Sequence, residues 1–242
     1  LMSVIRLALV STMSIQSIAT ASTVTLSAIA PLVATAIGMP SSFIGTYVCF
    51  IYIGAAFAAV AGGTMVTRYG GIHVSQGCLI LAAIGLILSA VPYFVCICFG
   101  GLLLGLSYGP ITPASSDILS HTVPKERMGF VFSLKQTAVP LGSALAGFIV
   151  PSVALWADDW KAGPHTMAVL ALIVALLVLY HRSQLDDHFD PKSRFSIHTV
   201  LNALRLVTSQ SGLRRMCIVS FVYNGTQMCV CLLYTSPSPR DV

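Results

Sequence analysis

The chain reverses direction at Gly62-Gly63-Thr64-Met65-Val66-Thr67-Arg68-Tyr69-Gly70-Gly71-Ile72-His73, a glycine-rich turn with Arg68 as its one formal charge. A long apolar run lies on each side of this turn. Two apolar runs joined by so few residues are expected to be antiparallel neighbours. The nature of the runs therefore decides the fold.

Charged residues are unusually scarce. Of the 242 residues, 56% are hydrophobic and 9% charged, and the mean hydropathy is +0.86. A soluble domain carries about 25% charged residues. The composition predicts an all-α polytopic membrane protein, integral and multi-pass, in a bacterial inner (plasma) membrane. In such a chain the net charge of +5 is no sign of a nucleic-acid partner.

A bilayer core of ~30 Å needs about 20 apolar residues per helix. Six runs qualify, and a seventh begins near Cys217 and is cut short. We expect a six-helix bundle over 5–180, a polar cytoplasmic loop over 181–215, and the start of a seventh helix over 216–230. The six runs are Leu7–Ala30, Ser42–Val66, Val74–Ala90, Phe94–Leu119, Gly129–Val153 and Thr166–Tyr180.

The basic residues predict the orientation. Apart from Lys135 and Arg240, every Lys and Arg except Lys161 belongs to the N-terminus, the 2–3 turn, the 4–5 turn or the polar loop. Cytoplasmic loops carry the excess of Lys and Arg, so the N-terminus is expected in the cytoplasm.

Apolar residues at helical spacing over 196–207 also predict a short surface helix.

Residues 231–242 abandon the apolar pattern. The segment Cys231-Leu232-Leu233-Tyr234-Thr235-Ser236-Pro237-Ser238-Pro239-Arg240-Asp241 resembles the translation of a sequencing adaptor. We expect native sequence to stop near Val230.

An internal repeat shifts three positions by 84 residues: Pro40, Gly45 and Gly63 recur as Pro124, Gly129 and Gly147. The shift covers three helices, an odd number, so the copies cross the membrane in opposite directions. Inverted repeats of this kind are typical of secondary transporters.

Six helices, a cytoplasmic segment and a seventh helix resemble the N-terminal half of a major facilitator superfamily transporter. The family's 2–3 turn reads Gly-x-Leu-x-Asp-Arg-x-Gly-Arg-Arg/Lys. Gly63, Arg68 and Gly70 are in register with it, whereas Thr67 replaces the acid and Gly71-Ile72 replace the basic pair. Three further phrases resemble the family: Lys125-Glu126-Arg127-Met128-Gly129, Trp160-Lys161 and Gly142-Ser143-Ala144-Leu145-Ala146-Gly147.

The resemblance implies a bundle of 3+3 inverted repeats whose C-terminal half is missing, and a 2–3 turn that acts as a cytoplasmic gate. We expect Gly63 to allow close helix approach. Gly70 and Gly71 can supply positive φ. Because the turn lacks its acid, the partner of Arg68 must come from elsewhere, with Asp117 the first candidate. The alternative is a basic turn without a gating role.

Lys135 is the most informative single residue. A charge at a helix centre costs ~2.5–3.5 kcal/mol, so it should face a cavity or a partner. Lys135 and Asp117 lie at matching depths in adjacent runs and could pair. If Asp117 instead takes Arg68, Lys135 is free to dock an anionic substrate, with Gln136 beside it. Snorkelling of Lys135 is the third alternative.

The first run is unusually polar, with Gln16, Thr20, Thr23 and Ser27 on one helical face. This stripe could line a water-filled pathway, or it could form interhelical hydrogen bonds. Tyr108 is a further candidate for the cavity, as are Asn224 and Gln227 in the seventh run. Gly101, Gly105 and Gly109 predict a flat face for close packing.

We therefore expect a secondary transporter that moves a small organic or inorganic anion by alternating access, with a coupling proton or cation. The alternatives are proton-coupled drug or metabolite efflux, and a transporter-like sensor that moves nothing. No nucleotide loop, metal cluster or nucleophile constellation is present in the sequence, which predicts a non-enzyme without cofactors.

Overall fold

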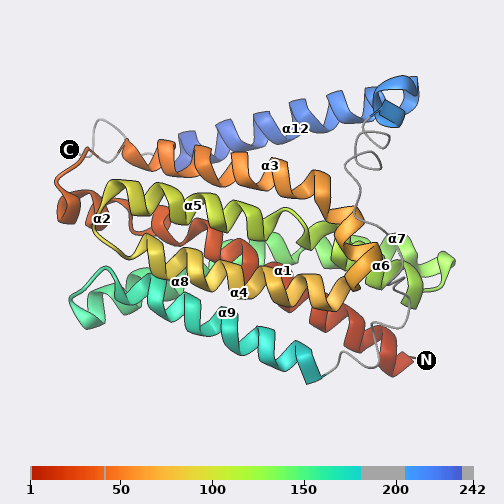
Figure 1. Ribbon diagram of the computed structural model, residues 1–242, viewed down its shortest axis with the longest axis horizontal. Helices are drawn as coiled ribbons and strands as arrows, with labels where there is room; N and C mark the ends of the chain where they lie inside the picture. Colours follow the sequence, from red (N-terminus) through yellow and green to blue (C-terminus); the bar gives the residue numbers. More distant parts are fainter. Residues whose placement is uncertain (1, 41, 181–204, 236–242) are drawn as a thin grey trace. The chain divides into compact units, whose positions relative to one another are not determined.

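The computed structural model describes residues 2–40, 42–180 and 205–235. The chain divides into two units, Leu1–Phe195 and Ser196–Val242, and each is considered by itself. Helices make up both described parts (Figure 1). The first unit contains α1 (Met2–Ala28), α2 (Ala30–Ile37), α3 (Phe43–Tyr69), α4 (Gly71–Ser89), α5 (Phe94–Tyr108), α6 (Ile111–Thr122), α7 (Lys125–Gln136), α8 (Ala138–Ala157) and α9 (Ala162–Tyr180).

Six stretches in the described residues are long and apolar enough to cross a membrane. They coincide with the six predicted runs, so the all-α membrane bundle is confirmed. Four of these spans are built on α1, α3, α4 and α9. The fourth span is divided into α5 and α6, and the fifth into α7 and α8.

Prolines explain the interrupted spans. A proline has no N–H, and its ring collides with the carbonyl four residues earlier. Pro110 and Pro113 lie at the α5–α6 junction, and Pro140 lies in the first turn of α8, just after the break at Thr137. Pro151 shows that the rule is not absolute, because α8 continues through it.

The helix contacts follow the inverted repeat. The helices α3 and α4, from the first three spans, both pack on α5 of the fourth span, and α8 and α9, from the last three spans, both pack on α1 of the first span. Exchanging the two halves turns the α3–α5 contact into α8–α1, and the α4–α5 contact into α9–α1. The α4–α9 contact maps onto itself. This symmetry supports the 3+3 arrangement independently of the glycine and proline matches.

The buried apolar residues form two clusters, one toward each end of the bundle. Ala21, Leu104 and Ala146 belong to the first. Ile15, Ile111 and Val131 belong to the second. The two helix breaks, at Gly109–Pro110 and at Thr137, lie where one cluster gives way to the other. The middle of the bundle is therefore where its helices are discontinuous.

The turn of residues 62–73 is a sharp reversal between α3 and α4. Gly70 has φ 87° and ψ 152°, as predicted for a glycine at this position. Gly71, by contrast, starts α4 without positive φ, and a Cβ there would lie 2.7 Å from Cγ1 of Ile118. The expectation of positive φ at Gly71 is wrong, because this glycine makes room for α6.

The expected close approach at Gly63 is also wrong in this structure. A Cβ at Gly63 would meet nothing within 4 Å, whereas one at Gly62 would lie 2.9 Å from Cγ of Pro113. Gly62 faces the bundle and is buried, whereas Gly63, the next residue, faces outward and is exposed.

Glycines pack α5 against α3 as predicted. A Cβ at Gly105 would overlap the carbonyl oxygen of Ile51, and one at Gly101 would lie 2.9 Å from the ring of Tyr47. Gly109 makes a similar approach to Ala55. On α8, Gly142 fits against the backbone of Ser17, whereas Gly147 has open space around it.

In the second unit, α12 spans Ser211–Thr235. This helix begins before Cys217, inside the stretch assigned to the polar loop, and continues beyond Val230 into the segment assigned to a non-native tail. Of the expected surface helix over 196–207, residues 196–204 lie outside the described part of the chain.

Candidate functional site

A hydrogen bond between α1 and α5 lies at the middle of the bundle. Nε2 of Gln16 donates to the hydroxyl of Tyr108 over 3.4 Å, and Gln16 is 2% exposed. Oε1 of Gln16 is buried and has no hydrogen-bond partner among the described residues. A hydroxyl can donate or accept, so either orientation of the amide makes this bond and leaves its other polar atom unsatisfied. The structure thus brings together two predicted site residues.

The rest of the polar stripe on α1 is satisfied within the helix. The Thr20 hydroxyl donates to the carbonyl of Gln16 at 2.9 Å, and the Thr23 hydroxyl donates to that of Thr20 at 2.7 Å. Ser27 is exposed. Of the stripe, Gln16 is the member whose side chain bonds to another helix and keeps a buried polar atom without a partner among the described residues.

Ser17, which the sequence reasoning passed over, ties α1 to the break in the fifth span. Its hydroxyl donates to the carbonyl of Ala138 at 3.0 Å. Ala138 opens α8, directly after Thr137. A serine beside the Gln16 stripe was a visible signal, but its partner lies 121 residues away and could not be read from spacing.

Lys135 lies in the last turn of α7 and is 3% exposed. It shares a helix face with Val131, which packs in the cluster that contains Ile15 and Ile111. Since α7 contacts both α1 and α6, the Lys135 side chain is buried toward these helices. Gln136, the next residue, is exposed and points away from this environment. Among the described residues, Lys135 is therefore the buried cation of the bundle, whereas the side chain of Gln136 is exposed.

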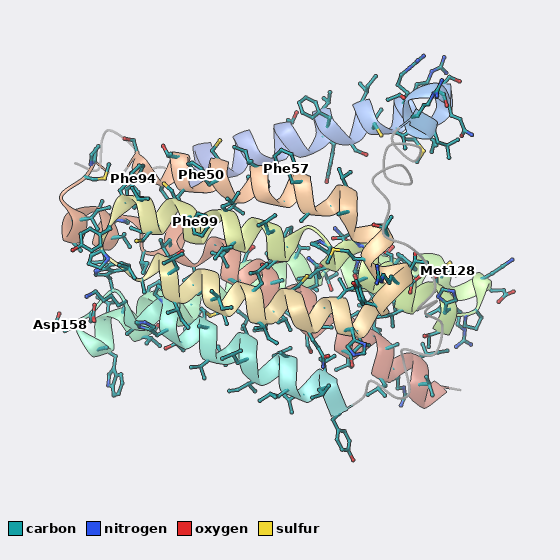
Figure 2. All side chains as sticks on the ribbon, viewed as in Figure 1. Phe50, Phe57, Phe94, Phe99, Met128 and Asp158 are labelled. Carbon is teal, nitrogen blue, oxygen red and sulfur yellow. The ribbon has the colours of Figure 1, made fainter. Side chains whose placement is uncertain are left out.

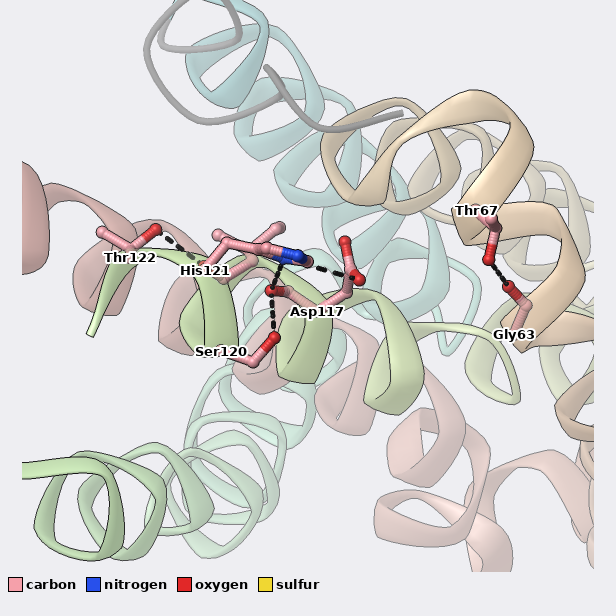
Figure 3. Close-up of polar contacts among 7 residues, drawn as sticks. Gly63, Thr67, Asp117, Ser120, His121 and Thr122 are labelled. Atoms are coloured by element: carbon pink, nitrogen blue, oxygen red, sulfur yellow. Dashed lines mark hydrogen bonds and ion pairs between the residues drawn. The ribbon is translucent and has the colours of Figure 1, made fainter. Parts of the chain in front are cut away.

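Asp117 pairs within its own helix. The Asp117 carboxylate lies 3.7 Å from Nδ1 of His121, one turn later on α6 (Figure 3). Nδ1 of His121 also lies 3.0 Å from the Asp117 carbonyl. Both side chains are more than a third exposed, at 47% for His121 and 37% for Asp117, so the pair contributes about 0–1 kcal/mol.

Neither expected partner of Asp117 is paired with it in this conformation. Among the residues that the structure describes, Asp117 forms its ion pair with His121. Neither Lys135 nor Arg68 forms an ion pair with a described residue. Asp117 lies beside the buried face of α6, which is formed by Ala114 and Ile118. The i, i+4 spacing of Asp117 and His121 is a sequence signal for this pair.

In the gating motif, Arg68 lies over the ring of Tyr69, with its guanidinium carbon 5.1 Å from the ring centroid. Thr67, which replaces the family's acid, donates to the carbonyl of Gly63 at 3.0 Å (Figure 3). The turn is thus stabilised by contacts between its own residues in this conformation.

The side chains of Asn224 and Gln227, the candidates in the seventh run, lie outside the described residues.

Basic residues gather at one end of the first unit. The N-terminus, the 2–3 turn and the start of α7 share this end, which holds Arg6, Arg68, Lys125 and Arg127. Met128 marks it in Figure 2, and Asp158 lies at the opposite end. There Asp159 accepts a bond of 3.0 Å from the Lys161 backbone N–H.

Six apolar spans, an inverted repeat and helices interrupted at mid-bundle define an integral, multi-pass membrane protein of the inverted-repeat class. The family model described as Major Facilitator Superfamily matches residues 12–238. The chain belongs to this superfamily, as its resemblance implied.

Among solved structures, the chain is similar to a peptide transporter POT, crystallised as an E310Q mutant in complex with sulfate. The TM-score is 0.60 at 17% sequence identity, and the match covers 90% of this chain and 46% of the transporter. The likeness supports the fold, and the chain spans less than half of that protein. Comparison with curated proteins finds no match.

Proposed function

We propose that the protein is the N-terminal half of a secondary transporter that moves a small organic or inorganic anion by alternating access. Membership of the superfamily supports transport. The 46% coverage of a transporter of the same fold supports a second six-helix half. Discontinuous helices at mid-bundle are where substrates bind in inverted-repeat transporters.

The observation that carries the anion proposal is the burial of Lys135 without an acidic partner. At 3% exposure, this ammonium forms no ion pair with any described residue. A buried charge is retained where it meets an opposite charge or lines a cavity. A bound anion supplies that charge in the loaded state. Gln16 and Tyr108 are proposed to orient the substrate through hydrogen bonds, and Thr20 borders the same stretch of α1.

Proton-coupled efflux needs a titratable acid in the cavity, and the position of Asp117 does not favour it. Its side chain is 37% exposed and is paired with His121 on the outer side of α6. We retain Asp117 in a different proposed role, as a member of the cytoplasmic gate with Gly63, Arg68 and Gly70. The partner of Arg68 in the closed gate is proposed to come from the second half.

Uptake into proteoliposomes tests the proposal. The full-length protein from the source locus is reconstituted, and the entry of labelled monocarboxylates, dicarboxylates, nitrate, a neutral sugar and an amine is measured with and without a pH gradient. We expect saturable uptake of one anion class. Preferential movement of the amine would support drug efflux instead, and binding of an anion without movement would support a sensor.

The gate is tested separately by thiol labelling of full-length protein in inside-out vesicles. Arg68→Ala is expected to increase cytoplasmic labelling of cysteines placed along α1, because the closed state loses a contact. Arg127→Ala, which removes an exposed charge from the same end, is the control. Identical labelling of Arg68→Ala and wild type would contradict a gating role while leaving the anion proposal intact.

A further inference from the structure

A groove of about 1010 Å³ opens between α3 and α4. Phe57, Ala61 and Met65 line it from α3, and Gly77, Cys78 and Leu81 line it from α4. Leu106 of α5 and Pro110 form its floor. The groove exists because α3 and α4 both pack closely on α5 but contact each other little. Ala61 on one wall and Gly77 on the other contribute small side chains that leave room in it.

One end of the groove is polar and basic. Arg68, Tyr69 and His73 line it there, and none of the described residues that line the groove is Asp or Glu. Arg68 is held over the Tyr69 ring rather than in an ion pair with a described residue. A guanidinium presents parallel N–H donors that match the oxygens of a phosphate. The basic end is therefore complementary to a phosphate group without a neighbouring ammonium.

The dimensions fit one leaflet of a bilayer. Phe57 and Arg68 are eleven residues apart on the continuous helix α3, which is about 16 Å at 1.5 Å per residue. Half of a hydrocarbon core of ~30 Å is about 15 Å. Phe57 is 74% exposed at the far end (Figure 2), so the groove opens sideways from the bundle. Its apolar part thus runs from the basic turn to the midplane of the span.

We propose that this groove binds an anionic phospholipid, with an acyl chain between α3 and α4 and the phosphate on Arg68. Basic pockets between transmembrane helices on the cytoplasmic side bind anionic head groups. A zwitterionic lipid also carries a phosphate, but its ammonium finds no carboxylate among the lining residues that the structure describes. The site is separate from the proposed substrate site at Lys135, which is buried toward α1 and α6.

Lipid retention tests the head-group contact. The full chain is reconstituted in nanodiscs of equal phosphatidylglycerol and phosphatidylcholine, extracted in mild detergent, and the retained lipids are counted by native mass spectrometry. We expect wild type to retain phosphatidylglycerol preferentially. Arg68→Gln should lower that retention at least fivefold, whereas Arg127→Gln, which removes an exposed arginine from the same end, should not. Equal retention of the two lipids by wild type would overturn the proposal.

A second pair of variants tests the acyl-chain contact. A Cβ at Gly77 meets nothing within 4 Å, so Gly77→Leu is expected to place its side chain in the groove without a clash at Cβ. Gly147→Leu adds the same side chain in open space on α8. Gly77→Leu should displace both lipid types from the site, and Gly147→Leu should displace neither. Unchanged retention in Gly77→Leu, at unchanged helix content, would contradict the groove as the site.

Photocrosslinking locates the lipid without any variant. Phosphatidylglycerol with a diazirine in mid-chain is expected to label peptides from residues 57–65 and 74–81. Labelling spread evenly over the exposed faces of α8 and α9 would refute a specific site. Labelling that avoids residues 57–65 and 74–81 altogether would equally refute the lipid as the occupant of the groove.

Discussion

Gln16 and Tyr108 are 92 residues apart and share a hydrogen bond of 3.4 Å between α1 and the end of α5. The bond joins the first helix of one repeat to the first helix of the other, beside the break at Gly109–Pro110. It leaves one buried polar atom of the Gln16 amide unsatisfied. A buried polar atom without a partner costs about 1–3 kcal/mol, which a substrate or water at this place would offset.

Tyr108→Phe tests this relationship. The change removes the hydroxyl, so the Gln16 amide loses its hydrogen bond to α5. We therefore expect the folded protein to be destabilised by about 1 kcal/mol and substrate binding to weaken. Thermal unfolding of the reconstituted protein and the KM for uptake are the measurements. Tyr93→Phe is the matched control, because Tyr93 is 69% exposed. Equal behaviour of the two variants would mean that the Tyr108 hydroxyl has no role.

Gly105→Ala is expected to disrupt the α3–α5 contact. Its Cβ would overlap the carbonyl oxygen of Ile51, a backbone atom that cannot move alone. Overpacking typically costs 1–3 kcal/mol, and a collision with backbone belongs at the upper end. Gly147→Ala introduces the same methyl group where nothing lies within 4 Å. A lowered melting temperature in Gly105→Ala alone, measured in detergent, is the expected result; equal temperatures would argue against this packing.

The two glycines of the gating motif should respond in opposite directions. Gly70 has φ 87° and ψ 152°, a region that is essentially restricted to glycine, so Gly70→Ala is expected to cost about 1–3 kcal/mol. Gly63 lies inside α3 with open space around it, so Gly63→Ala should stabilise the helix by about 0.5–1 kcal/mol. Chemical denaturation compares the two variants with wild type.

Transport by the same variants separates folding from gating. If Gly63→Ala is stable but does not transport, Gly63 is needed for contact with the second half. If it is stable and active, Gly63 is dispensable to the gate, and the gate functions through Arg68, Gly70 and Asp117.

Hydropathy and proline positions sufficed to predict the spans, because a bilayer imposes length and apolarity on each helix separately. Local chemistry likewise predicted the positive φ at Gly70. Properties that depend on which helix faces which were harder to predict. Gly62 packs on Pro113 while its neighbour Gly63 faces away, and that difference reflects the rotation of α3 about its axis.

The same limit applies to the candidate site. The spacing of Lys135 and Asp117 predicted equal depth, but depth does not determine direction, and Lys135 follows Val131 into the core while Asp117 stays beside the buried face of α6. Gln136 was grouped with Lys135 by adjacency, although neighbouring residues on a helix differ by about a quarter turn. The Ser17–Ala138 bond depends on two separate spans and had no local signal.

The most direct test of the anion proposal is initial uptake by full-length Lys135→Ala, beside Lys135→Arg and the double variant Lys135→Ala/Asp117→Ala. Loss of a buried, charge-paired contact costs about 2–5 kcal/mol, which is a fall in kcat/KM of roughly 30-fold or more. We predict this loss in Lys135→Ala, partial uptake in Lys135→Arg, and no recovery in the double variant. Undiminished uptake by Lys135→Ala, or its recovery in the double variant, would contradict Lys135 as the anion-docking residue.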